Sequence, residues 1–173
     1  RGKDLVKGIS GPGITTYKDV MSHGSAYKLA DLDPKDVAAL QFTGGTTGLP
    51  KAATLTHENI YINCQQAGRW FPGILDGQEK ILTVLPLFHV FAMTICMNYM
   101  AMRGGEMVMQ PNFDKDNAAK AIGSGATIFA GVPAMFNALA NHPDVKSGKI
   151  KMDALKYTNQ RQTKKMAVAT FVS

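Results

Sequence analysis

The stretch FTGGTTGLPKAATLTH, residues 42–57, places three glycines and three threonines at six consecutive positions and continues to a lysine. Glycines permit positive φ, so the backbone can turn several N–H groups toward one concave side, which suits an anion. The threonine hydroxyls can donate to phosphate oxygens or accept from a metal-bound water, and the lysine adds a mobile positive charge. The sequence therefore predicts a polyphosphate-binding loop that comprises Thr43, Gly44, Gly45, Thr46, Thr47, Gly48, Leu49, Pro50 and Lys51.

Two common phosphate-binding motifs do not fit this loop. The P-loop has Gly directly before Lys and Ser or Thr directly after it, whereas here Leu49 and Pro50 separate Gly48 from Lys51. Pro50 also prevents the loop from continuing straight into a helix at the lysine. The spacing GxGxxG of dinucleotide-binding folds is absent from the stretch. The alternative to a phosphate-binding loop is a surface hairpin rich in glycine and threonine that binds no ligand.

Segments typical of strands and helices alternate around this loop. The expected strands are 36–43, 80–86, 105–110 and 126–132, and the expected helices are 54–70, 90–102, 114–125 and 133–142. Near-continuously apolar strands that alternate with helices indicate an α/β fold built on a mostly parallel sheet with flanking helices. We expect the first strand to be buried and to lead through the glycine loop directly into the first helix.

Helix starts are marked by residues that can satisfy free backbone N–H groups or that lack one. Thr56 is the expected N-cap of the first helix, whose buried face includes Cys64 and Ala67. Asp114 is the expected N-cap of the third helix. Pro133 suits the first turn of the fourth, where its missing N–H costs nothing.

Composition and charge exclude several classes of protein. The 173 residues are 45% hydrophobic and 18% charged, which argues against a disordered chain. The net charge of +6 arises entirely from residues 146–173, because residues 1–145 carry 12 basic and 12 acidic side chains. A basic tail that contains only Tyr157 and Phe171 as aromatic residues argues against a nucleic-acid surface.

The cysteines and the longest apolar run predict free thiols in a reducing compartment and no membrane-spanning helix. Cys64 and Cys96 lie far apart in apolar surroundings, which favours buried free thiols in a reducing compartment. Residues 81–102 carry no charge, but Pro86 separates a strand-like part from a helix-like part. We therefore expect a buried strand and a buried helix in this run rather than a membrane span.

The loop resembles the phosphate-binding motif of the adenylate-forming enzymes, which include acyl-CoA synthetases, luciferases and the adenylation domains of peptide synthetases. Residues 42–48 match this motif, as do Pro50 and Lys51, and the pair at 56–57 matches its Thr-His. Glycine at position 44 is similar to bacterial long-chain fatty-acid CoA ligases. Ala52 departs from the usual glycine by one methyl group.

Two further segments resemble the same family in the same order. LPLFHVFAM at 85–93 is similar to its second motif, and ATIFAGVPAMFNAL at 126–139 is similar to a strand and Val-Pro helix beside the acyl pocket. The resemblance covers roughly residues 36–157. It implies an acyl pocket that includes Phe88, His89, Met93, Gly131, Val132 and Pro133.

The resemblance implies a reaction in which a carboxylate attacks the α-phosphate of ATP and the thiol of coenzyme A then displaces AMP. The implied partners are a long-chain fatty acid, ATP and coenzyme A, with Mg²⁺ near Thr43 and without nucleic acid. The implied location is the cytoplasm, with peripheral membrane association left open. A noncatalytic module that binds phosphate or another anion is the alternative function.

The family's metal-binding Tyr-Gly-x-Thr-Glu segment and its catalytic lysine have no match in these 173 residues. We therefore expect a fragment that is inactive alone, in which residues 1–35 are an irregular N-terminal segment and 36–158 a partial AMP-binding domain. Residues 159–173 form a basic tail that departs from the family pattern. The sequence leaves the acyl chain length and the oligomeric state open.

Overall fold

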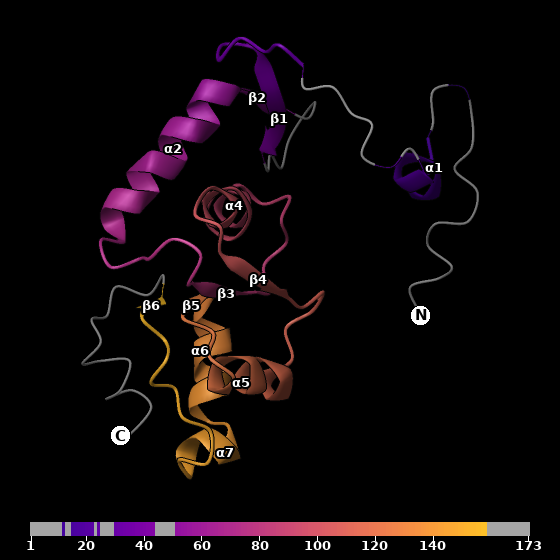
Figure 1. The fold of residues 1–173 in the computed structure, drawn as a ribbon. Coiled ribbons are helices and arrows are strands. Elements are labelled where there is room, and N and C mark those ends of the chain that lie inside the picture. The colour runs from indigo at the N-terminus through magenta and orange to yellow at the C-terminus, as the bar shows by residue number, and fades with distance from the viewer. Residues whose placement is uncertain (1–11, 13–14, 23, 25–29, 44–50, 159–173) are drawn as a thin grey trace. The chain divides into compact units, whose positions relative to one another are not determined.

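The computed structural model describes residues 12, 15–22, 24, 30–43 and 51–158 (Figure 1). The chain divides into two units, residues 1–33 and 34–173. In the first unit, helix α1 spans Tyr17–Ser22 within the segment expected to be irregular. Its start is stabilised by Thr16, whose hydroxyl donates to Asp19 Oδ2 at 2.6 Å and accepts from the Asp19 amide at 3.2 Å.

The second unit begins with an antiparallel hairpin, whose second strand the sequence did not predict. Strand β1 spans Val37–Thr43 and pairs with strand β2, Lys51–Thr56, in a register that ends at Thr43 opposite Lys51. The expected direct passage from glycine loop to helix is therefore wrong, because six residues of strand intervene. The residues of β2 run directly into the helix, and no glycine or proline separates the two elements. The sequence therefore contains no signal that a strand precedes the helix.

Strand β1 also corrects the expectation of a buried strand. Val37, Leu40 and Phe42 are each more than half exposed. Within the described residues, β1 pairs with β2 alone and lies outside the four-stranded sheet. Its side chains therefore do not contribute to the interior of that sheet.

Helix α2 spans His57–Trp70 and begins where the cap was expected, although not at position 54. The Thr56 hydroxyl accepts from the Asn59 amide at 3.1 Å, and the Asn59 side chain accepts from the Thr56 amide at 3.1 Å. This reciprocal capping box satisfies donors that the first turn leaves free. Cys64 and Ala67 are buried on the inner face, as the spacing predicted.

Four parallel strands form the main sheet among the described residues, in the order β4-β3-β5-β6. Their bounds are Glu106–Met109 for β4, Lys80–Thr83 for β3, Ile128–Ala130 for β5 and Tyr157–Thr158 for β6. All three pairings are parallel. The predicted α/β class with a mostly parallel sheet is confirmed.

The helix expected at 90–102 is present but changes its winding midway. It comprises α3 (Val90–Ala92), the π-helix η1 (Met93–Asn98) and α4 (Tyr99–Met102). The Tyr99 amide donates to the Thr94 carbonyl, five residues back. Such wide turns in a helix often accompany functional sites.

Helices cover both faces of the sheet (Figure 1). Ile81, Ile128 and Ala130 pack in one core with α2 and the α3–η1–α4 helix, while Leu82 and Phe129 pack in a second core. The strands thus point alternate side chains to opposite faces. That second core also contains residues of helices α5, Lys115–Gly123, and α6, Pro133–Ala140.

The ends of the remaining helices agree with the sequence except at one point. The Asp114 carboxylate caps α5 by accepting from the Asn117 amide at 2.8 Å, and Pro133 lies in the first turn of α6. The helix expected at 133–142 ends at Ala140, and Pro143 then begins a further short helix that was not expected, α7, which spans Pro143–Lys146. Proline is suited to a helix start because its fixed φ is helical and its missing N–H needs no partner there.

The burial of the two cysteines and the division of the apolar run into a strand and a helix are confirmed. Cys64 and Cys96 are free and buried, and burial raises the pKa of the Cys96 thiol to about 11. The apolar run 81–102 folds as strand β3 followed by the α3–η1–α4 helix. In the part of the chain that the structure describes, no helix combines the length and apolarity needed to cross a membrane.

Candidate functional site

The hairpin fixes the two ends of the predicted phosphate loop beside each other. Thr43 and Lys51 are register partners, and the Thr43 hydroxyl donates to the Lys51 carbonyl at 3.2 Å. Both side chains are exposed, and the Thr43 oxygen retains its lone pairs for a further donor or a cation. The seven residues between them, Gly44, Gly45, Thr46, Thr47, Gly48, Leu49 and Pro50, lie outside the described residues.

A short turn after β3 contains two predicted pocket residues, Phe88 and His89. The His89 amide donates to the Pro86 carbonyl at 3.0 Å, which closes the turn. Nδ1 of His89 accepts from the Phe91 amide at 3.3 Å and so caps helix α3. Because Nδ1 accepts, the proton of the neutral ring lies on Nε2, and the exposed side chain can donate it to a ligand.

Gln41 connects the hairpin to this turn. Its Nε2 donates to the Phe88 carbonyl at 3.2 Å, across 47 positions of sequence, and to the Phe42 carbonyl at 3.3 Å. The strand that leads into the predicted phosphate loop therefore lies against the turn that bears His89. Sequence reasoning did not identify Gln41, because nothing in its local pattern indicates a partner so distant along the chain.

Three of the other four predicted pocket residues follow β5, at the same edge of the sheet. The carboxyl ends of parallel strands meet at one edge, so the turn after β3 and the segment Gly131–Pro133 after β5 leave the sheet together. Gly131 is buried, and a Cβ atom there would lie 2.7 Å from the Phe129 ring. The close approach explains why this position is glycine.

Among the described residues, at least three cavities border helix α2. One of about 420 Å³ lies between α2 and the start of the α3–η1–α4 helix, and Ile60, Ile62, Val90 and Met93 line it. A second of about 350 Å³ is lined by Trp70, Phe71, Phe91, Ile95, Ala130 and Tyr157, among others. Of the six predicted pocket residues, Met93 lines the first of these two cavities.

The second cavity contains apolar residues that the motifs did not single out. Phe91 and Ile95 are four positions apart on one helix, a spacing that could have indicated a shared face. The Phe71 and Tyr157 rings meet edge to face with centroids 5.2 Å apart. Trp70 is 83% exposed at the cavity mouth. An apolar ligand could bury its surface there.

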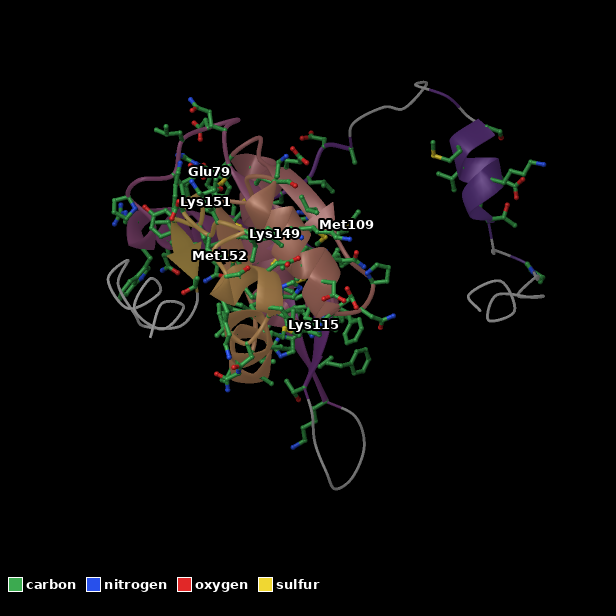
Figure 2. All side chains as sticks on the ribbon, turned by 90° about the horizontal axis from the view of Figure 1, so that it is seen from below. Glu79, Met109, Lys115, Lys149, Lys151 and Met152 are labelled. Atoms are coloured by element: carbon green, nitrogen blue, oxygen red, sulfur yellow. The ribbon has the colours of Figure 1, made fainter. Side chains whose placement is uncertain are left out.

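An ion pair between a buried carboxylate and a partly exposed lysine lies at the opposite, amino-terminal edge of the sheet. Glu79, directly before β3, has Oε1 2.8 Å from Lys156 Nζ, directly before β6 (Figure 2 labels Glu79). Burial raises the pKa of Glu79, but the hydrogen bonds from Lys156 and the Leu75 amide, with the charge of Lys156, outweigh it and lower the pKa overall. This pair joins the segment before β3 to the segment before β6, and it lies at the edge of the sheet opposite the predicted site.

No group of three or more His, Cys, Asp or Glu side chains that could hold a metal ion occurs among the described residues. The predicted metal contact at Thr43 would instead be a single hydroxyl oxygen, which suits a hydrated magnesium ion carried by a nucleotide.

The fold of this chain aligns with solved structures of adenylate-forming enzymes. ATP-bound MatB from Rhodopseudomonas palustris aligns with a TM-score of 0.66 at 25% identity, over 77% of this chain and 25% of that one. A malonyl-CoA ligase complex with methylmalonyl-CoA and AMP aligns with a TM-score of 0.65, over 76% of this chain and 28% of that one.

Sequence comparison gives the family. Residues 8–168 match the AMP-binding enzyme family, and the chain belongs to it. A long-chain-fatty-acid–CoA ligase of Bacillus subtilis is 41% identical over 117 residues, 66% of this chain and 21% of that protein. One of Escherichia coli O6:H1 is 34% identical over 147 residues, 82% of this chain and 26% of that protein. The chain thus spans about a quarter of the length of these curated relatives.

Proposed function

We propose that this chain contributes the phosphate-binding hairpin and part of the acyl pocket to an ATP-dependent long-chain fatty-acid CoA ligase. The observation that carries the proposal is the pairing of Thr43 with Lys51, which presents both exposed side chains at the end of a hairpin beside the His89 turn. The relatives from Bacillus subtilis and Escherichia coli are ligases of this kind.

In this proposal the segment from Thr43 to Lys51 binds the β- and γ-phosphates of ATP. The Lys51 ammonium pairs with a phosphate oxygen, and the Thr43 hydroxyl contacts the hydration shell of Mg²⁺. When bound, Mg²⁺ would neutralise part of the phosphate charge. Thr43 and Lys51 are fixed relative to each other by the strand register, so the ligand meets groups that are already in place.

The fatty acid carboxylate would lie near His89, whose Nε2–H can donate to it, and beside Gly131, Val132 and Pro133. The alkyl chain would extend along the apolar cavities that flank α2, which Met93 and Phe91 help to line. The carboxylate is the nucleophile at the α-phosphate, so pyrophosphate leaves and acyl-AMP forms. The coenzyme A thiol then attacks the acyl carbon, and AMP leaves with the carboxylate oxygen. The protein contributes orientation and charge stabilisation.

The proposal places this reaction in the cytoplasm, where free cysteines such as Cys64 and Cys96 remain reduced. The 173-residue chain is expected to bind ATP weakly and to show no turnover, because the catalytic lysine that the family resemblance implies has no match in its sequence.

Isothermal titration calorimetry with Mg·ATP tests the proposal. A charge-assisted hydrogen bond contributes about 1.5–3 kcal/mol, so Lys51→Met should raise the Kd for ATP by roughly ten- to a hundredfold. The matched control is Lys151→Met, which removes an exposed lysine between α7 and β6 and should leave the Kd unchanged. Equal effects of the two substitutions, or no heat with the unsubstituted chain, would overturn the proposed phosphate site.

A further inference from the structure

The half-buried amide of Gln41 has both of its N–H groups engaged by carbonyl oxygens. One contact is local, to Phe42 at 3.3 Å, and the other is distant, to Phe88 at 3.2 Å. A glutamine amide has only two N–H donors, and its oxygen cannot replace either of them opposite a carbonyl. The single amide nitrogen of Gln41 therefore bridges a carbonyl of its own strand and a carbonyl of the turn after β3.

Gln41 is two positions before Thr43 in β1, so both side chains lie on the same face of the hairpin. Its register partner on β2 is Ala53, which offers the amide no polar side chain. The distant contact to Phe88 thus has no competitor across the hairpin at that position.

The acceptor in that contact belongs to the peptide that joins Phe88 to His89. A peptide group is planar, so the Phe88 carbonyl and the His89 amide turn together. The His89 amide closes the turn with Pro86, and its imidazole Nδ1 accepts from the Phe91 amide. One peptide plane therefore connects the carbonyl that Gln41 contacts to the residue that bears the imidazole.

We propose that Gln41 is a positioning residue that couples the phosphate end of the hairpin to the His89 turn, so that ATP bound at Thr43 and Lys51 changes the geometry at His89. This inference rests on the proposed ligase function. Gln41 touches neither ligand and acts through Phe88. One neutral hydrogen bond supports a coupling of roughly two- to tenfold between the affinities for ATP and for the carboxylate.

The test uses the 173-residue chain labelled with ¹⁵N and two substitutions at position 41. Gln41→Leu keeps the approximate size but removes the donor, and Gln41→Glu keeps the shape but places an acceptor opposite the Phe88 carbonyl. The matched control is Gln65→Leu on α2, since the Gln65 amide also makes contacts within this unit, to the Tyr61 hydroxyl and Met102. The probe is Mg²⁺ with α,β-methylene-ATP, which blocks transfer at the α-phosphate.

In the unsubstituted chain and in Gln65→Leu, the probe should shift the amide resonances of Thr43, Lys51 and His89. In both position-41 variants the shifts at Thr43 and Lys51 should persist while the shift at His89 is lost. A His89 shift that survives in either folded variant overturns the inference and leaves the phosphate site standing. Absence of all shifts in the unsubstituted chain overturns the phosphate site, and the inference with it.

Discussion

Removing the ammonium group of Lys156 should destabilise the fold in a way that depends on pH. Glu79 is 2% exposed, and its Oε1 accepts from Lys156 Nζ at 2.8 Å and from the Leu75 amide at 3.2 Å. Its second oxygen, Oε2, is buried without a hydrogen-bond partner among the described residues. The substitution Lys156→Met would leave this carboxylate charged and without its counter-ion.

The expected loss follows from the burial of each partner. Breaking a fully buried pair costs about 3–5 kcal/mol, but the Lys156 side chain is 37% exposed and solvent screens part of the interaction. We therefore expect the free energy of unfolding at pH 7 to fall by about 2 kcal/mol. The variant Glu79→Gln should cost less, about 1 kcal/mol, because the half-exposed ammonium can be solvated instead.

The sign of the pH effect follows from the lowered pKa of Glu79 in the folded protein. A carboxyl group with a depressed pKa stabilises the fold above its unfolded value, about 4.3, and this stabilisation is lost as the pH falls through the folded pKa. In Lys156→Met, the effect of burial on Glu79 is opposed by fewer favourable contacts, so the pKa of Glu79 should rise. Acid should then protonate this unpaired carboxylate and remove its charge. The difference between the two proteins should therefore shrink toward pH 3.

Urea unfolding followed by circular dichroism, at several pH values between 3 and 7, measures this difference. The double variant Glu79→Gln, Lys156→Met isolates the pairwise coupling, which should be about 1–2 kcal/mol. A loss that stays constant from pH 7 to pH 3, or a coupling near zero, would refute the claim that Lys156 stabilises a buried charge.

Three further predictions concern the fold around the site. Thr56→Ala should lower the free energy of unfolding by about 1 kcal/mol because it removes the capping box of α2, whereas the exposed Thr54→Ala should change it far less in the same urea titration. Gly131→Ala should cost about 1–3 kcal/mol through the clash with the Phe129 ring, and Phe129→Leu should recover part of that loss in the double variant; a neutral effect of Gly131→Ala alone would contradict the packing. Cys96, with its pKa raised to about 11, should react with iodoacetamide much more slowly in the native protein at pH 8 than in urea, and equal rates would show that the thiol is accessible.

Hydrophobic pattern and capping chemistry predicted most of the main sheet and its helices. The strands β3, β4 and β5 and the caps at Thr56 and Asp114 follow from short apolar runs and from residues that satisfy free N–H groups. These signals are local, so sequence alone contains them.

Features that depend on tertiary contacts escaped prediction. Strand β2 has weak strand propensity and is specified by its pairing with β1 rather than by its own residues. The π-helical turn at Met93–Asn98 has no distinctive composition. In the site, Gln41 acquires its role through Phe88, 47 positions away, and the cavity beside Trp70 is formed by segments that the chain order separates.

The central claim is that the end of the β1–β2 hairpin binds the outer phosphates of a nucleotide. The most direct measurement compares the amide shifts of Thr43 and Lys51 in the ¹⁵N-labelled chain on addition of Mg·ATP, Mg·pyrophosphate or AMP. ATP and pyrophosphate should shift both resonances, and AMP should leave them unchanged, because it lacks the β- and γ-phosphates. Equal shifts with AMP, or none with pyrophosphate, would contradict the claim.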